Sequence, residues 1–282
     1  MGRCGDQFPI FLVGCPRSGT TLLQSMLAAH PAIASFPETK FFFYGVPQYE
    51  PKRQAFGMVS RQLNPWLREF FTEHLKRPEL LQSLPRIPLM SLYLKKMIGI
   101  LESLTKEQGK SIWLEKTPEH LYYVETIEKL IAGVRFIHIV RNGADVVASL
   151  YEVTHKYPKP WKGALDIDRC IGRWLEAIPL SDRHLQKPNH TLVRYENLVE
   201  EPRSTLVKIC DFLGIEFDDS MLDNFGSVAQ QVSMDEAGRS VGSKIKSTNS
   251  QKFYEIFDES QRQYILNRIS AIDLDRLNSK AN

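Results

Sequence analysis

Gly14-Cys15-Pro16-Arg17-Ser18-Gly19-Thr20-Thr21 is the stretch that most strongly predicts the fold of this chain. It follows the apolar run Pro9–Val13, which is typical of a buried parallel strand. It opens a predicted helix over residues 20–29, whose apolar side chains share one face: Leu22, Leu23, Met26 and Leu27. A glycine-bearing loop between a buried strand and a helix is the usual context of a phosphate-binding loop.

Outward from this loop, apolar strands and amphipathic helices alternate. Further strands are predicted at 33–36, 111–114, 135–140 and 190–194, and helices at 119–131, from 142 to 151, at 164–185, at 203–213 and from 258 onward. We interpret the proline-rich region of about 44–108 as a helical insertion between core strands. The alternation predicts a three-layer α/β fold of the P-loop nucleotide-binding type, with a central parallel β-sheet and helices on both faces. We expect residues 1–282 to form a single domain.

The composition narrows the classes of protein. With 36 Lys and Arg against 33 Asp and Glu, the net charge is +3, well short of the basic excess of nucleic-acid-binding domains. No apolar run approaches ~18 residues, so we expect no transmembrane segment. The cysteines are scattered without metal-ligand spacing, so we expect reduced thiols in a cytoplasmic protein and no bound metal: Cys4, Cys15, Cys170 and Cys210.

The loop differs from that of nucleoside triphosphate hydrolases. Its backbone N–H groups and the following helix N-terminus favour a bound phosphate, with predicted contacts from Arg17, Ser18, Gly19, Thr20 and Thr21. Hydrolases carry lysine where this chain has Thr20. The predicted strand 135–140 ends in Arg141 rather than in a magnesium-binding aspartate. The loop therefore suits a donor with one 5′-phosphate that bears a transferable group, rather than γ-phosphoryl transfer.

A second anion site is predicted after the strand 135–140. Arg141 stands at the carboxyl end of that strand, where open α/β sheets bind ligands. Ser149 follows about two helical turns later. Arginine suits a terminal phosphate because it donates hydrogen bonds in a bidentate fork.

Together these two motifs resemble those of the 3′-phosphoadenosine-5′-phosphosulfate (PAPS)-dependent sulfotransferases. Gly14–Leu23 is similar to their 5′-phosphosulfate loop, and Val140–Ser149 to their 3′-phosphate motif. Pro-Arg-Ser-Gly-Thr-Thr is closer to the tyrosylprotein and carbohydrate branch than to the cytosolic phenol and steroid branch. The resemblance extends from residue 9 to about 257. It implies PAPS as sulfuryl donor, adenosine 3′,5′-bisphosphate (PAP) as product, and a hydroxyl or amine acceptor.

The resemblance also implies catalytic roles. Glu38 resembles the general base of the tyrosylprotein and heparan-type enzymes, which basic and aromatic residues follow. Rival bases are His120, His30 and His155, of which His120 is the strongest because it follows Glu115-Lys116-Thr117-Pro118. Arg17 is expected beside the bridging oxygen, and Lys116 near the sulfuryl group.

Further donor contacts are expected at Tyr195, in Arg194-Tyr195-Glu196, and at Ser243 and Lys252, in or near a late glycine- and cation-rich loop. The acceptor, a small molecule, carbohydrate or lipid-like compound, is expected between the insertion and residues 151–165. Nine aromatic residues are candidates either for its pocket or for the core, which is the more common place for aromatics: Phe41, Phe42, Phe43, Tyr44, Trp66, Tyr93, Tyr151, Tyr157 and Trp161.

Two other functions fit parts of the pattern. One is a P-loop kinase that uses ATP, against which Thr20 and Arg141 weigh. The other is a non-catalytic nucleotide-binding module, which would need the phosphate loop but no base.

Overall fold

A computed structural model describes residues 8–232 and 251–278 of the chain. Five strands form one parallel sheet in the order β2-β3-β1-β4-β5. The strands are β1 (Ile10–Gly14), β2 (Ile33–Ser35), β3 (Ile112–Lys116), β4 (Arg135–Val140) and β5 (His190–Arg194). The predicted central parallel sheet is confirmed.

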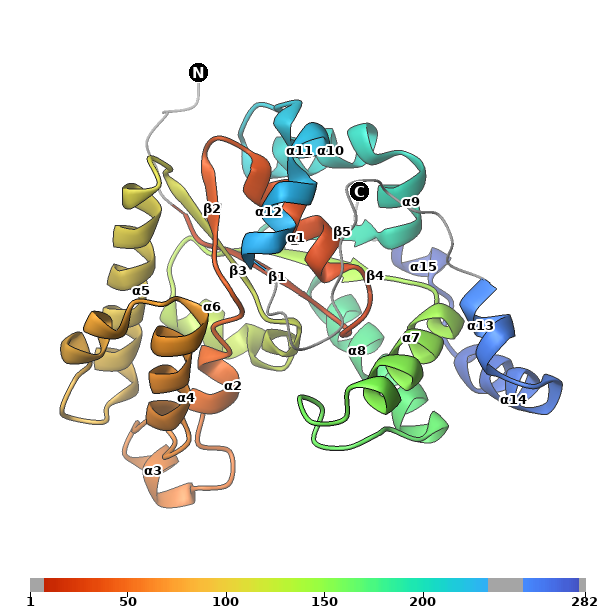
Figure 1. The fold of residues 1–282 in the computed structure, drawn as a ribbon, viewed down its shortest axis with the longest axis horizontal. Helices are drawn as coiled ribbons and strands as arrows, with labels where there is room; N and C mark the ends of the chain where they lie inside the picture. The colour runs from red at the N-terminus through yellow and green to blue at the C-terminus, as the bar shows by residue number, and fades with distance from the viewer. Residues whose placement is uncertain (1–7, 233–250, 279–282) are drawn as a thin grey trace.

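Helices cover both faces of this sheet (Figure 1). The α-helices are α1 (Thr20–Ala29), α2 (Phe41–Gly45), α3 (Pro51–Ala55), α4 (Leu63–Glu69), α5 (Met90–Glu107), α6 (Val124–Leu130), α7 (Gly143–Lys156), α8 (Ile167–His184), α9 (Tyr195–Glu200), α10 (Pro202–Leu213), α11 (Ser220–Asp223), α12 (Phe225–Val232), α13 (Gln251–Ile256), α14 (Glu259–Ile269) and α15 (Asp275–Asn278). A π-helical turn (Phe70–His74) and two 3-10 helices (Pro78–Ser83 and Pro118–Tyr123) complete the described elements.

The central strand β1 is buried on both sides, which explains its unbroken apolar sequence. Ile10 and Leu12 belong to a core cluster that includes Leu23 and Leu27 of α1. Phe11 belongs to the other cluster, with residues of α7 and α8. Successive side chains of a strand point to opposite faces, so β1 joins the two helical layers.

Two predicted boundaries are corrected. β3 continues to Lys116, so Glu115 and Lys116 lie within the strand rather than after it. The predicted helix 119–131 is instead a 3-10 helix, Pro118–Tyr123, followed by the short α6. Between β2 and β3 the chain forms α2 to α5, as the helical interpretation of 44–108 predicted. In the described parts of the chain, no helix is both long and apolar enough to cross a membrane.

Three buried histidines form a cluster: His138 of β4, His190 of β5 and His184 of α8. His190 Nε2 donates to Glu128 Oε1 at 3.0 Å, which leaves its Nδ1 to accept from His138 Nε2 at 2.8 Å. The His184 ring stacks on both. Burial lowers the pKa of His138 and His184, and lowers the pKa of His190 to about 4 despite its bond to Glu128. The cluster is therefore built for neutral imidazoles.

We predict that this cluster makes the protein less stable in mild acid. The unfolded chain takes up protons at histidine near pH 6.5, but the folded chain does so only at lower pH. The contribution of the cluster to the free energy of unfolding is therefore fully present above pH 6.5 and is lost as the pH falls toward about 4. We expect the free energy of unfolding, measured in urea between pH 7 and 4.5, to fall by about 2 kcal/mol or more.

His184→Gln should flatten this slope, because it removes one of the groups that titrates. His155→Gln, on the exposed part of α7, is the matched control and should keep the slope. An equal slope in both variants would contradict the assignment.

Candidate active site

The loop between β1 and α1 has the geometry of an anion cradle. Arg17 and Gly19 have positive φ angles of 73° and 94°, and the Ser18 N–H donates to the Cys15 carbonyl at 3.2 Å. This compact turn leads directly into α1 at Thr20, so the helix N-terminus faces the same space as the loop.

Gly19 is needed for a second reason. A Cβ atom at this position would lie 2.2 Å from the Tyr195 ring, which packs directly on the loop. The Arg141 guanidinium also packs over the Tyr195 ring, 4.4 Å from the ring centroid. The ends of β1, β4 and β5 are thus joined through Gly19, Arg141 and Tyr195.

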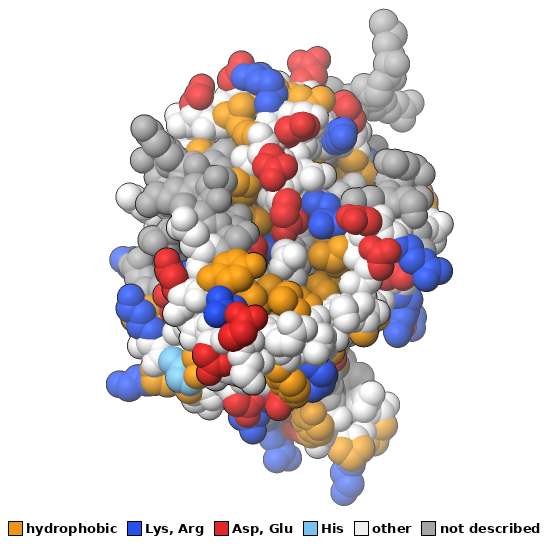
Figure 2. Space-filling view, turned by 90° about the vertical axis from the view of Figure 1, so that its right-hand side faces the viewer, with side chains coloured by type: hydrophobic (Ala, Val, Ile, Leu, Met, Phe, Trp, Pro, Cys, Tyr) orange, Lys and Arg blue, Asp and Glu red, His pale blue; other side chains and the backbone are white. Residues whose placement is uncertain are grey.

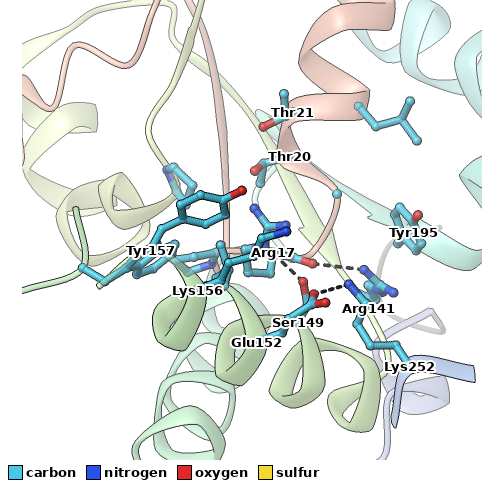
Figure 3. A pocket seen from close by; sticks show the side chains of 16 residues that line it. Arg17, Thr20, Thr21, Arg141, Ser149, Glu152, Lys156, Tyr157, Tyr195 and Lys252 are labelled. Carbon is cyan, nitrogen blue, oxygen red and sulfur yellow. Dashed lines mark hydrogen bonds and ion pairs between the residues drawn. The ribbon is translucent and has the colours of Figure 1, made fainter. Parts of the chain in front are cut away.

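Polar contacts fix the two arginines of the predicted anion sites. Arg17 Nε donates to Ser149 Oγ at 3.1 Å, and Arg141 Nη1 donates to the Arg17 carbonyl at 3.2 Å. Trp174 Nε1 donates to the Arg141 carbonyl at 2.9 Å, and Asp145 lies 3.7 Å from the Arg141 guanidinium. The structure therefore brings the two motifs of the sequence together at one place (Figure 3).

These residues line a pocket of about 620 Å³. Its described lining residues are Pro16, Arg17, Gly19, Thr20, Thr21, Leu22, Pro118, Arg141, Ser149, Glu152, Val153, Lys156, Tyr157, Trp161, Tyr195 and Lys252. Four cations face one carboxylate, Glu152, which pairs with Lys252. The positive excess suits a polyanionic ligand. Ser243 lies outside the described residues.

Sequence reasoning missed Glu152 and Lys156. Both follow Ser149 on α7 at helical spacing, with Val153 between them, so this face of α7 forms one wall. The i, i+3, i+4, i+7 pattern from Ser149 was the signal that could have found them.

Glu38 and Lys116 form a buried ion pair at the end of β3. Lys116 Nζ donates to Glu38 Oε1 at 2.5 Å, and both side chains are almost fully buried. Lys40 lies 3.9 Å from the other carboxylate oxygen. The pair is not among the described residues that line the pocket, but Pro118, two residues after Lys116, does line it. A buried charge requires such pairing, and the contact joins positions 78 residues apart.

Glu115 holds the segment that carries Glu38. Its carboxylate accepts hydrogen bonds from the Thr39 N–H at 3.0 Å, the Thr39 hydroxyl at 2.7 Å and the Thr117 hydroxyl at 2.8 Å. Burial alone would raise the pKa of Glu115, but His120 and the threonine hydrogen bonds bring it below its usual value. This buried carboxylate therefore fixes the chain on both sides of the Glu38–Lys116 pair.

His120 has a structural place rather than the predicted catalytic one. Its Nδ1 donates to Glu115 at 3.0 Å and its Nε2 accepts from the Phe42 N–H at 3.2 Å. The side chain is fully buried, so neither ring nitrogen is placed to take a proton from an acceptor. His30 is likewise engaged, because Nε2 donates to the Glu216 carbonyl and Nδ1 accepts from the Ala32 N–H. Glu38 is also buried and engaged, through its ion pair with Lys116.

The nine aromatic candidates for the acceptor pocket divide into three groups. Tyr157 and Trp161 line the pocket. Phe41, Phe42, Trp66 and Tyr93 are instead buried core residues. These four residues belong to the same apolar cluster as Phe11 of β1, so they extend the core on that face of the sheet. Phe43, Tyr44 and Tyr151 are not among the described residues that line the pocket.

Among the described residues, no cluster of three or more His, Cys, Asp or Glu side chains is placed to hold a metal ion.

Comparison with known proteins identifies similar chains. Residues 9–219 match the model of a family described as the sulfotransferase family. Protein-tyrosine sulfotransferase A of Caenorhabditis elegans is 24% identical over 243 residues, which are 85% of this chain and 58% of that protein. This chain thus spans less than two thirds of that relative's length.

Solved structures share the fold. A sulfotransferase domain from the curacin biosynthetic pathway superposes with a TM-score of 0.63 at 22% identity, covering 94% of this chain and 99% of that domain. A mouse sulfotransferase in complex with PAP superposes with a TM-score of 0.51 at 13% identity, covering 98% of this chain and 87% of the mouse chain.

We predict that Gly19→Ala disrupts the loop far more than the same change elsewhere. Gly109 also has a positive φ, of 71°, but a Cβ there meets nothing within 4 Å. Gly109→Ala should cost about 1 kcal/mol of unfolding free energy from backbone strain alone. Gly19→Ala should cost about 2–4 kcal/mol, because the methyl group also overlaps Tyr195. Urea unfolding of both variants measures the difference, and equal losses would disprove the contact with Tyr195.

Proposed function

Because this chain belongs to the sulfotransferase family, we propose that it transfers a sulfuryl group from PAPS to a hydroxyl or amine of an acceptor by in-line displacement. The observation that carries the proposal is the joining of two anion-binding motifs in one pocket. The phosphate loop follows β1, and Arg141 follows the neighbouring β4. Arg17 of the loop donates a hydrogen bond to Ser149, and Arg141 donates one to the Arg17 carbonyl. PAPS carries its phosphosulfate and its 3′-phosphate at two separate positions, which a pocket with two anion sites matches.

The residues present fit such a donor. Among the described residues, Ser18 Oγ and Arg141 Nε are buried and have no hydrogen-bond partner. Buried polar groups normally have partners, so phosphate oxygens at the loop and at Arg141 would supply acceptors that the protein lacks. A pocket of about 620 Å³ lies in the size range of nucleotide and cofactor sites.

We assign the reaction to three charged side chains. Arg17, in the pocket, stabilises negative charge on the departing phosphate oxygen, and Lys116 stabilises charge on the transferred group. Glu38 takes the acceptor proton. Lys116 binds Glu38 directly, so the cation and the base are positioned as one unit at the end of β3.

The acceptor enters beside the loop that follows α7. Tyr157 and Trp161 give that side of the pocket aromatic surface, which suits a phenol, a sugar ring or a lipid-like chain. The name of the Caenorhabditis elegans relative specifies protein tyrosine as its acceptor. A phenolic hydroxyl is therefore the first acceptor to test.

The kinase alternative is less well supported. Thr20 occupies the position of the P-loop lysine, and β4 is followed by Arg141 in place of a magnesium-binding carboxylate. Both features that hold and polarise a γ-phosphate differ in this chain.

We predict that the protein binds PAP tightly and ATP with Mg²⁺ weakly in calorimetric titrations. Arg141→Ala should weaken PAP binding by roughly 1.5–3 kcal/mol, which is about 10- to 150-fold, because a charge-assisted hydrogen bond is lost. Arg183→Ala, at an exposed position of α8, is the control and should bind PAP like the unmodified protein. Preference for ATP, or PAP affinity unchanged in Arg141→Ala, would refute this donor site.

We predict that Glu38→Gln lowers kcat by roughly 10²–10⁴-fold while PAP affinity is preserved, as expected for loss of a general base. The assay follows labelled sulfate from PAPS to tyrosine peptides, phenols and oligosaccharides. Glu255→Gln, exposed on α13, is the matched control and should retain full kcat. Full turnover in Glu38→Gln would exclude Glu38 as the base.

A further inference from the structure

The helices between β2 and β3 end in a tip that projects away from the sheet. We call residues 43–63 and 85–96 the basic tip, with α3 at its outer end, at the lower left of Figure 1. Backbone contacts join its two segments: the Val59 N–H donates to the Pro88 carbonyl and the Met90 N–H to the Gly57 carbonyl, both at 2.9 Å. The tip is therefore an ordered structure with a fixed surface.

That surface exposes large apolar side chains. Tyr49 is 92% exposed, Phe56 74% and Ile87 59%, and Phe43 and Leu92 are also exposed. Single exposed apolar residues are common, but five on two adjoining segments are a concentration. Exposure of these side chains to water is unfavourable, and their burial against a binding partner would lower the free energy.

The same surface is strongly positive. The basic tip contains six Lys or Arg and one acidic residue, Glu50, although the net charge of the whole chain is only +3. Glu50 is engaged inside the tip, where it accepts from the Ser60 hydroxyl at 2.6 Å and the Arg61 N–H at 3.1 Å. Lys52, Arg86 and Lys95 are exposed. By contrast, acidic and basic side chains are interspersed over the face around α7, α13 and α14 (Figure 2).

We propose that the basic tip docks the protein onto an anionic lipid bilayer. Phe56 and Ile87 insert among the lipid chains near the headgroups, while Lys52, Arg86 and Lys95 contact the anionic headgroups. A surface that exposes both apolar side chains and long cations suits the bilayer interface, where anionic headgroups cover apolar lipid chains.

Charge complementarity and chemistry favour a bilayer over other partners. A nucleic-acid duplex would use the cations but would leave Phe56 and Ile87 in water. A protein interface concentrates apolar residues in a core and depletes it of charge. Here exposed cations and exposed apolar side chains occur on the same two segments, as in segments that lie on a membrane surface.

Flotation with vesicles tests the docking. The full chain should float with vesicles of phosphatidylcholine that contain phosphatidylserine, and at least about tenfold more weakly with phosphatidylcholine alone. High salt should weaken the binding. Phe56→Ser/Ile87→Ser and, separately, Lys52→Glu/Arg86→Glu should each reduce affinity about tenfold or more. Val207→Ser/Lys208→Glu, on the surface of α10, is the matched control and should float normally.

PAP titration of each variant separates this proposal from the proposed function, because the tip contributes no described residue to the pocket. Unchanged PAP affinity with lost flotation supports docking. The proposal is overturned if the protein does not float, or if both tip variants float normally. It is also overturned if the tip instead retains an RNA duplex or drives self-association in light scattering while vesicles stay unbound.

Discussion

The parallel alignment of β1, β3, β4 and β5 is the constraint on which the rest of the molecule depends. The carboxyl ends of parallel strands lie at one edge of the sheet. At this edge, each of the four strands ends at or next to a residue or loop of the candidate site. The close approach is tight: a Cβ atom on Gly14 would lie 2.4 Å from the Ile139 carbonyl oxygen of β4. Because the phosphate loop rests directly on its neighbouring strand, its distance from Arg141 is set by the backbone and does not depend on flexible side chains.

Buried hydrogen bonds position the segment beside β3. Glu115 of β3 is hydrogen-bonded to Thr39, Thr117 and His120. Through Thr39 it fixes the segment that contains Glu38 against the end of the strand. A carboxylate with this many donors is stable in the interior although an isolated one would not be. The cost is that removing any partner leaves a buried charge or donor uncompensated. The Glu115 cluster is thus sensitive to mutation of any of its members.

Features encoded by local sequence were the predictable ones. The ends of β4 and β5 and the span of α1 follow from uninterrupted apolar runs and clear breaks, so Arg141 could be placed at the edge of the sheet in advance. The expected role of Tyr195 came instead from the family resemblance. The occupation of His120 could not be predicted, because it depends on Glu115 and on Phe42, 78 residues away. The pairing of Lys116 with Glu38 is equally non-local. The sequence left the aromatic residues at and near the insertion open between a ligand pocket and the core, because both have the same composition.

The position of β1 at the centre of the sheet also shapes how the chain is made. β1 is synthesised before both of its hydrogen-bonding partners, β3 and β4. Until ribosomes have completed residues 112–116 and 135–140, this wholly apolar strand has two open edges, which is the condition for mispairing with other chains. Nascent molecules consequently depend on rapid packing of α1 against β1, or on chaperones, for the whole interval between translation of the first strand and arrival of its neighbours.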